Sequence, residues 1–235
     1  MKKLLALLPL LLIASVTGAQ TLDEIINKNS RATGTELLEK AKTIYVEGKA
    51  VQMGMEMPMK MYMKQPDKIK VVVTYNGMEI ITLFDGQKGY MVNPLMGSTE
   101  PVEVPQEQLG NIKGNNMFHN QLLDNFKAGK LSLMGSEDVN GKPAFKIMAT
   151  VEGGTPIYFF VDKESYLTVK TTTTVNQMGQ DMEVESYIKE YHDINGIKFP
   201  KVTVSFVNGS EMGSTSLDKV EIDKPIEDSV FTLSK

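Results

Sequence analysis

The chain has 235 residues, of which 25 are lysine or arginine and 29 are aspartate or glutamate, and it contains no cysteine. The lack of cysteine excludes disulfide bonds, zinc–thiolate sites and thiol nucleophiles. The formal net charge of −4 disfavours nucleic acid as a partner, because proteins that bind it present a basic face to the phosphates. It also disfavours tight binding to anionic lipid headgroups.

The first 19 residues have the pattern of a secretory signal peptide. Two lysines precede an apolar stretch at 4–16, and small residues then lead to a cleavage site after Ala19. The stretch is shorter than the roughly 20 apolar residues of a membrane span, and Pro9 disfavours a retained helical anchor. We therefore expect an exported protein that is soluble in the bacterial periplasm after cleavage, without stable membrane insertion.

The mature chain, residues 20–235, is expected to form one domain. Removal of the signal peptide leaves 23 basic and 29 acidic residues, a net charge of −6. Its start predicts a helix, since Thr21 can cap it, apolar residues recur at helical spacing, and Gly34 can end it. A second short helix is expected over residues 35–41.

From Lys42 onward the apolar period changes from helical to two, which predicts half-buried β-strands. The dipeptides at 76–77 (Asn-Gly) and 85–86 (Asp-Gly) favour tight hairpins, because these residues tolerate positive φ. The runs between turn signals give about ten to twelve antiparallel strands, enough to curl a twisted sheet towards a barrel. The expected fold class is mainly β, with some helix (α+β).

The middle of the chain, residues 97–130, interrupts the strands with prolines and glycines. It contains an amphipathic segment at 115–127, which we expect to be one helix. The apolar residues that fall on one face of that helix are Phe118, Leu122, Leu123 and Phe126.

Candidates for catalysis are few. His119 and His192 belong to no recognisable catalytic or metal-binding spacing, so a surface or capping role is favoured for both. Asp181, Glu183 and Glu185 alternate along one predicted strand, which is typical of its solvent-exposed face. We therefore expect neither an enzyme nor a cofactor.

Six methionines occupy every second position of the segment 53–63. Residues 54–58 contain a glycine and a proline and predict a turn, which leaves Met59, Met61 and Met63 together on one face of a strand. Three interpretations of this face remain open: packing in the core, lining of an adaptable apolar cavity, and binding of Cu(I) by thioethers.

Short motifs rich in turn residues follow one another along the mature chain. They are ATG at 32–34, KQPDKIK at 64–70, FDGQKGYMVNP at 84–94, GKPAFKI at 141–147, FVDK at 160–163 and YHDINGIKFP at 191–200. In their order and spacing the chain resembles the LolA/LolB-like superfamily of periplasmic lipoprotein-sorting proteins. The resemblance is strongest to the outer-membrane lipoprotein-sorting-like branch that is common in Bacteroidetes.

The resemblance implies an unclosed antiparallel β-barrel, or strongly curved sheet, with helices plugging its concave side. In the family this hollow accepts acyl chains of lipoproteins or other hydrophobic ligands, and residues 118–126 would form its lid here. The early-strand arginine of the family is replaced by Lys70, which lacks the forked donor geometry of arginine. The residues expected to line the hollow are Met57, Met59, Met61, Met63, Val71, Val73, Phe118, Leu122, Phe126, Phe145, Ile147, Phe159 and Val204.

The function expected on this basis is a monomeric periplasmic carrier of hydrophobic ligands, in particular lipoprotein acyl chains, that works by reversible burial. One alternative is an interaction or sensor module for another envelope protein, which a long edge strand without lysine or proline would favour. The other alternative is a Cu(I) site formed by Met59, Met61 and Met63.

Overall fold

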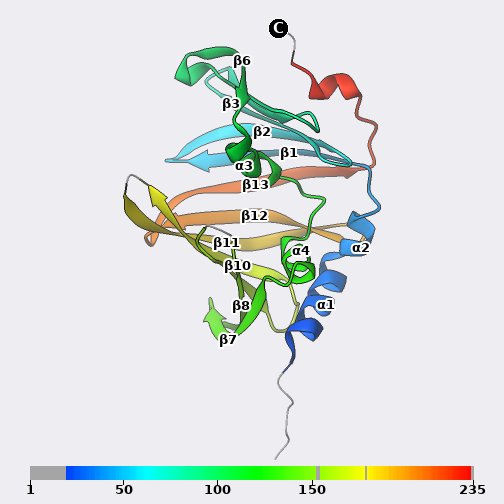
Figure 1. Ribbon diagram of the computed structural model, residues 1–235, viewed down its shortest axis with the longest axis vertical. Helices are drawn as coiled ribbons and strands as arrows, with labels where there is room; N and C mark the ends of the chain where they lie inside the picture. Colours follow the sequence, from blue (N-terminus) through cyan, green and yellow to red (C-terminus); the bar gives the residue numbers. More distant parts are fainter. Residues whose placement is uncertain (1–19, 152–153, 178, 234–235) are drawn as a thin grey trace, which may run out of the picture.

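The computed structural model describes residues 20–151, 154–177 and 179–233, so the predicted signal peptide lies outside the described residues. Within them, thirteen antiparallel strands form one sheet in the order β6-β5-β4-β3-β2-β1-β13-β12-β11-β10-β9-β8-β7 (Figure 1). In the described part of the chain β6 and β7 end the sheet and do not pair with each other, so the barrel is unclosed. The expected mainly β fold is confirmed, with one strand more than the upper end of the expected range.

The strands form a meander in which nearly all neighbours are consecutive in sequence. The exception is the pair β1–β13, which joins the beginning and end of the chain. The strands are β1 (Thr43–Gln52), β2 (Met55–Lys64), β3 (Lys68–Tyr75), β4 (Met78–Phe84), β5 (Gly89–Asn93), β6 (Ser98–Val104), β7 (Leu131–Val139), β8 (Lys142–Ala149), β9 (Ile157–Asp162), β10 (Thr168–Gln177), β11 (Gln180–Ile194), β12 (Ile197–Val207) and β13 (Ser210–Ile222).

The helices precede the sheet or interrupt it between β6 and β7. They are α1 (Leu22–Thr33), α2 (Thr35–Leu38), α3 (Leu109–Lys113) and α4 (Gln121–Lys127), with 3-10 turns η1 (Pro94–Met96), η2 (Gln106–Gln108) and η3 (Asp228–Phe231). Among the described residues, none of the helices combines the length and apolar character needed to cross a bilayer.

Helix α1 begins and ends where the sequence predicts. The Glu24 N–H donates to Thr21 Oγ1 at 3.3 Å, and the Thr21 N–H donates to Glu24 Oε2 at 3.1 Å, which completes a capping box. Gly34 ends the helix in the left-handed conformation, with φ of 70°. A Cβ at Gly34 would lie 2.1 Å from the Gly196 carbonyl oxygen, so the close approach of helix and sheet also requires glycine.

Strand β2 runs without interruption through the segment that was predicted to turn. The turn lies instead at Met53 and Gly54, whose φ values are 51° and 78°. Pro58 is tolerated inside the strand because β3 pairs with β2 only from Met59 onward, so among the described strands β1 alone pairs with β2 at that position. Proline lacks a backbone donor and is compatible with a strand position that is unpaired on one side.

The amphipathic segment 115–127 is also not one helix. Asn120 is the N-cap of α4, and its Oδ1 accepts the N–H groups of Leu122 and Leu123, each at 3.1 Å. Phe118 therefore precedes the helix and packs in a different apolar cluster from Leu122.

The two faces of the sheet have separate cores. The face that packs against α1 to α4 is called the inner face, and it carries Ile44 on β1, Met61 on β2 and Phe159 on β9. It holds one cluster around β1–β4 and α3 and a second around β8, β9, α1 and α4. On the outer face, the C-terminal segment packs Phe231 against Leu83, among other residues.

Candidate functional site

A row of five methionines on β2 lies on the inner face. The row consists of Met55, Met57, Met59, Met61 and Met63, which point the same way because they alternate along one unbroken strand. Their exposed fraction falls along the strand, from 42% at Met55 to 8% at Met61 and 0% at Met63, with Met57 and Met59 between these limits. The same residue type thus forms surface at one end of the strand and core at the other.

The exposed end of this row continues across the neighbouring strands. Tyr75 on β3 pairs with Met78 on β4, and the Tyr75 hydroxyl donates a hydrogen bond to Met55 Sδ at 3.2 Å. Val73 and Ile80 form the next pair that points to the same face, two residues along the same strands. Successive partners in a sheet share a face, so these side chains are all on the inner face.

The apolar positions continue across β5 to β6, at the edge of the sheet. Met91 on β5 pairs with Thr82 on β4 and with Val102 on β6. We call the resulting set the methionine surface. Its members are Met55, Met57, Met59, Val73, Tyr75, Met78, Ile80, Met91 and Val102.

A strip of small residues lies on the other side of the methionine row. The inner-face positions of β1 beside Met57 and Met59 are Ala50 and Gly48. On β13, Thr215 lies opposite Ala50. A Cβ at Gly48 would lie 2.1 Å from the Ser216 carbonyl oxygen, so this position is restricted to glycine. The strip beside the methionine row therefore carries only small side chains at these positions.

Helix α3 covers the part of the inner face that is formed by Phe84 on β4, Gly89 on β5 and Val104 on β6. Gly89 on β5 makes room for it, since a Cβ there would lie 2.5 Å from Leu109 Cδ2 and 2.9 Å from Ile112 Cδ1. Lys113 places its Nζ 4.4 Å from the centroid of the Phe84 ring. In Figure 1 the helices lie over the centre and right of the sheet, whereas the left ends of β1 and β2 are uncovered.

The segment between α3 and α4 extends this cover over the buried end of the methionine row. The Met117 N–H donates to Met63 Sδ at 3.3 Å, and Phe118 packs in the same cluster as Met61 and Met63. We call residues 105–127, which include both helices, the plug. Its apolar side chains pack in both clusters of the inner face, with Leu109, Ile112 and Phe118 in one and Leu122 in the other.

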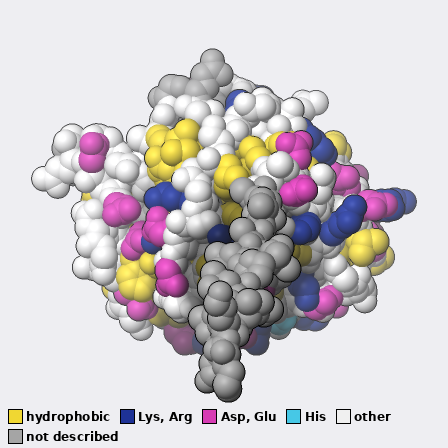
Figure 2. Space-filling model, turned by 90° about the horizontal axis from the view of Figure 1, so that it is seen from below, with side chains coloured by type: hydrophobic (Ala, Val, Ile, Leu, Met, Phe, Trp, Pro, Cys, Tyr) yellow, Lys and Arg dark blue, Asp and Glu magenta, His cyan; other side chains and the backbone are white. Residues whose placement is uncertain are grey.

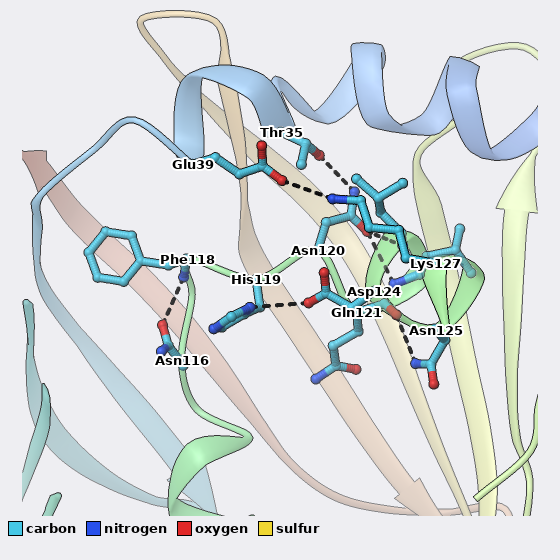
Figure 3. A network of polar contacts seen from close by, with 12 residues as sticks. Thr35, Glu39, Asn116, Phe118, His119, Asn120, Gln121, Asp124, Asn125 and Lys127 are labelled. Carbon is cyan, nitrogen blue, oxygen red and sulfur yellow. Dashed lines mark hydrogen bonds and ion pairs between the residues drawn. The ribbon is translucent and has the colours of Figure 1, made fainter. Parts of the chain in front are cut away.

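A part-buried polar network fastens the plug, and Figure 3 shows its contact between Asn120 and Thr35. Asn120 Nδ2 donates to Thr35 Oγ1 at 2.8 Å, and it lies 3.2 Å from both Asn29 Oδ1 and Thr33 Oγ1. Asn29 in turn donates to the Tyr166 carbonyl oxygen at 2.7 Å. Because Asn29 is almost completely buried, removal of the Asn120 amide would take away the partner of its Oδ1, whereas Thr35 Oγ1 would keep its contact with Thr33 Oγ1 at 2.8 Å.

The exposed side of the plug carries two polar pairs, also visible in Figure 3. Lys127 Nζ lies 3.3 Å from Glu39 Oε1 on the chain after α2, and His119 Nδ1 lies 3.1 Å from Asp124 Oδ2. Their side chains are about half exposed, so such pairs contribute little stability.

The described residues show few of the side-chain arrangements that form a catalytic or metal centre. His192 places Nε2 2.7 Å from the Leu217 carbonyl oxygen, which is a structural contact. In the described residues, no group of three or more histidine, cysteine, aspartate or glutamate side chains could hold a metal ion. Of the three methionines considered for Cu(I), Met63 is buried, and its sulfur already accepts the Met117 N–H.

Most of the residues predicted to line a hollow lie on the inner face, in two groups. The first group surrounds β2 and consists of Met57, Met59, Met61, Met63, Val71, Val73 and Phe118. The second group surrounds α4 and consists of Leu122, Phe126, Phe145, Ile147 and Phe159.

One sequence-based placement needs correction. Val204 pairs with Tyr187 and Ser214, and this register puts it on the outer face, because its neighbour Thr203 is on the inner face. Lys70, which replaces the family's early-strand arginine, lies opposite Tyr62 on the outer face, away from the plug.

Sequence reasoning missed several members of the methionine surface: Met55, Tyr75, Met78, Ile80, Met91 and Val102. The signal was present in the Asn76-Gly77 hairpin, which sets Tyr75 opposite Met78. To use this signal, one must also know which face of β2 each methionine occupies, and the turn predicted at 54–58 obscured this for Met55 and Met57.

Two grooves lie elsewhere on the molecule. One of about 1050 Å³ is lined on the outer face by residues that include Tyr90, Glu100 and Phe231, and one of about 500 Å³ lies between α1, α2 and α4. Neither contains a residue of the methionine surface, which is an open and shallow surface.

Comparison with known proteins adds information on the fold. No family model matches the chain, and no curated protein matches its sequence. Among solved structures, a DUF1329 family protein from Desulfovibrio piger matches with a TM-score of 0.60 and 12% identity, over 88% of this chain and 97% of that one. A LolA superfamily protein from Nitrosomonas europaea matches with a TM-score of 0.59 and 13% identity, over 92% of this chain and 99% of that one.

A third structure is described as an outer membrane lipoprotein-sorting protein domain and comes from Vibrio parahaemolyticus. It matches with a TM-score of 0.57 and 11% identity, over 88% of this chain and 97% of that one. At these identities the similarity concerns the fold, and it bears out the resemblance seen in the sequence, while the Bacteroidetes-type branch stays a prediction. The protein therefore has the fold of the LolA superfamily.

Proposed function

We propose that the protein is a carrier that holds an acyl chain of a lipid or lipoprotein on its inner face, along the methionine surface. The observation that carries this proposal is the row of methionines on β2, which forms one continuous apolar strip from the core to the uncovered end of the sheet. A soluble domain rarely leaves such a strip open without a ligand or partner for it.

The chemistry of the strip suits an acyl chain. Methionine is unbranched and flexible, so a row of thioethers can adapt to a flexible hydrocarbon. Each CH₂ group removed from water gains about 0.8 kcal/mol, so about ten groups laid along the row would give about 8 kcal/mol before the costs of ordering the chain. The small residues Gly48 and Ala50 lie beside Met59 and Met57 on β1, so no bulky side chain from β1 competes with a ligand at these two positions.

Displacement of the plug would allow a larger ligand to bind. Phe118 and the residues of α3 pack in the same cluster as the buried end of the methionine row, so displacement of the plug would add Met61 and Met63 to the exposed strip. We propose that the free carrier hides this half with the plug. The second group of predicted lining residues, around Phe145 and Phe159, would then adjoin the same surface.

The remaining parts of the proposal follow from the same considerations. The signal pattern at 1–19 and the fold support a periplasmic location, with one domain over residues 20–235 and a monomeric carrier. Reversible burial requires no covalent step, so we propose a non-enzymatic protein without a cofactor.

The test compares two charge substitutions. Met57→Asp places a carboxylate in the middle of the methionine surface, and we expect it to reduce the affinity for a fluorescent fatty acid at least tenfold. Met53→Asp introduces the same charge in the β1–β2 turn, where the side chain is 79% exposed, and should have no effect. Equal affinity of the two folded variants would refute the proposed site. Native mass spectrometry of the wild-type protein from its host would identify the cargo.

A second candidate function is supported by the sheet edge at β7. This strand is nine residues long and contains neither lysine nor proline, whereas the opposite edge, β6, contains Pro101. Seen from the β7 end of the molecule, apolar side chains form separate patches among charged ones (Figure 2). Leu133 and Met134 are exposed on this edge, which would suit pairing with a strand of another envelope protein.

The edge can be tested separately from lipid binding. Leu133→Pro removes a backbone donor from β7 and should abolish capture of an envelope partner in a cross-linking experiment while fatty acid binding persists. If the variant captures the same partners as the wild type, the edge is not the contact surface.

A further inference from the structure

The methionine surface concentrates the sulfur of a chain that has no cysteine. The chain has 16 methionines, and those at 55, 57, 59, 61, 63, 78 and 91 share the inner face of β2, β4 and β5. Leucine or isoleucine would provide a similar apolar area at these positions. The property that methionine adds is a thioether, which oxidants convert to a polar sulfoxide.

These thioethers differ in access to solvent. Met55, Met78 and Met91 are 42%, 38% and 38% exposed, Met57 and Met59 are partly buried, and Met63 is completely buried under the plug. A diffusible oxidant therefore reaches the uncovered end of the strip first. The part of the surface that is open to a ligand is also the part that is open to oxidation.

The structure supplies a donor for one oxidised product. The Tyr75 hydroxyl points at Met55 Sδ from 3.2 Å and donates to it. A thioether is a weak acceptor, whereas a sulfoxide oxygen is a strong one, so the same hydroxyl would bond the oxidised side chain more tightly. Oxidation at Met55 is thus accommodated by the fold without exposing a new unpaired group.

We propose that the exposed methionines of the methionine surface are an oxidation site that switches off ligand binding. A hydroperoxide such as hydrogen peroxide transfers one oxygen atom to the sulfur. The O–O bond breaks, an S–O bond forms, the thioether sulfur loses two electrons and water is released. The sulfoxide is polar and chiral, so it faces the acyl chain with a dipole where a thioether made apolar contact. The inference rests on the proposed carrier function, which it extends to regulation.

The experiment measures fatty acid affinity before and after treatment with hydrogen peroxide, with peptide mass mapping of each methionine. Met53 and Met96, which are about 80% exposed and lie outside the surface, should oxidise first and leave the affinity unchanged. The affinity should then fall at least tenfold as Met55, Met78 and Met91 oxidise. Methionine sulfoxide reductases of both epimer specificities should restore it.

Two sets of substitutions separate the switch from general damage. In the variant with leucine at positions 55, 57, 78 and 91, the ratio of affinities before and after peroxide should be close to one. The ratio is taken within each variant, so a change in its starting affinity cancels. In the matched variant with Met53, Met96 and Met134 replaced by leucine, the ratio should stay as large as in the wild type.

The outcomes distinguish the two proposals. If the reduced wild-type protein takes up no fatty acid, the carrier function fails and the switch with it. If the protein binds fatty acid and keeps its affinity when Met55, Met78 and Met91 are oxidised, only the switch is refuted. Equal loss of affinity in the leucine variant would also refute it, because the loss would then not come from these thioethers.

Discussion

The two ends of β2 carry the same residue type in opposite environments. Met63 is fully buried, packs with Ile69 and accepts the Met117 N–H from the plug. Met55 is exposed, and its sulfur accepts the Tyr75 hydroxyl from the neighbouring strand. The difference lies in the cover and not in the strand, so one apolar strip is core at one end and surface at the other, where we propose that a ligand binds.

The largest expected difference between the two ends of β2 appears when the methionine side chain at each end is replaced by alanine. Met63→Ala should lower the free energy of unfolding by about 2–5 kcal/mol, because it opens a cavity under the plug. Met55→Ala should change it by less than about 0.5 kcal/mol, since the side chain is already exposed. Urea unfolding followed by circular dichroism measures both values. Similar costs at the two ends would show that the strip is not divided into core and surface.

The next largest effect on the free energy of unfolding is expected when the polar network that holds the plug is disrupted. Asn120→Ala removes the N-cap of α4 and leaves Asn29 and Thr35 with fewer partners, so we expect a loss of about 2–4 kcal/mol in unfolding free energy. Amide exchange in residues 105–127 should accelerate more than in β12. The matched change Asn125→Ala affects only an exposed hydrogen bond to Gln121 and should cost less than about 0.5 kcal/mol.

If Asn120→Ala leaves exchange in the plug unchanged, the polar network does not control the cover. The apolar contacts of α3 would then be sufficient to hold it in place.

The strand character and the helix ends could be predicted because their signals are local. Thr21 and Gly34 act within a few residues of their own position, and the Asn-Gly hairpins require only two residues of suitable φ. The curved, unclosed form of the sheet came from the order of the motifs rather than from any one of them.

The division of the inner face could not be predicted, because it depends on contacts between distant segments. Pro58 suggested a turn, yet it fits in β2 because β3 does not pair at that position. Phe118 has helical spacing relative to Leu122, yet Asn120 caps the helix between them and separates the two side chains. Val204 was misplaced for a related reason, since a shift of one residue in register reverses the face of a strand.

A smaller loss of stability is expected when a side chain is added in the space under α3. Gly89→Ala brings a Cβ into contact with the flexible ends of Leu109 and Ile112, so we expect a loss of about 1 kcal/mol and looser packing of α3. Gly110→Ala is the matched control within α3, because nothing lies within 4 Å of the added Cβ, and it should stabilise the helix by about 0.5–1 kcal/mol. Fatty acid binding should increase only in Gly89→Ala if the plug limits access. Equal binding in both variants would count against this role.

The smallest effect is expected on the outer face, where Asp228 holds the C-terminal segment. Its carboxylate lies 3.0 Å from Lys68 Nζ and 3.1 Å from Lys64 Nζ, and these partners, Lys68 first, lower its pKa below the ordinary 3.8. A lowered pKa in the folded state means that the contribution to stability is present at neutral pH and is lost as the pH falls through the folded pKa, below 3.8. Asp228→Asn should therefore be slightly less stable than the wild type at pH 7, and the difference should be smaller at about pH 2.

Unfolding at both pH values measures this difference, and fatty acid binding at pH 7 serves as its control. Because Asp228 and the methionine surface lie on opposite faces, Asp228→Asn should bind fatty acid as the wild type does. A loss of binding in this variant would mean that the two faces are coupled through the sheet. The cover on the inner face would then not be sufficient to explain which methionines are available to a ligand.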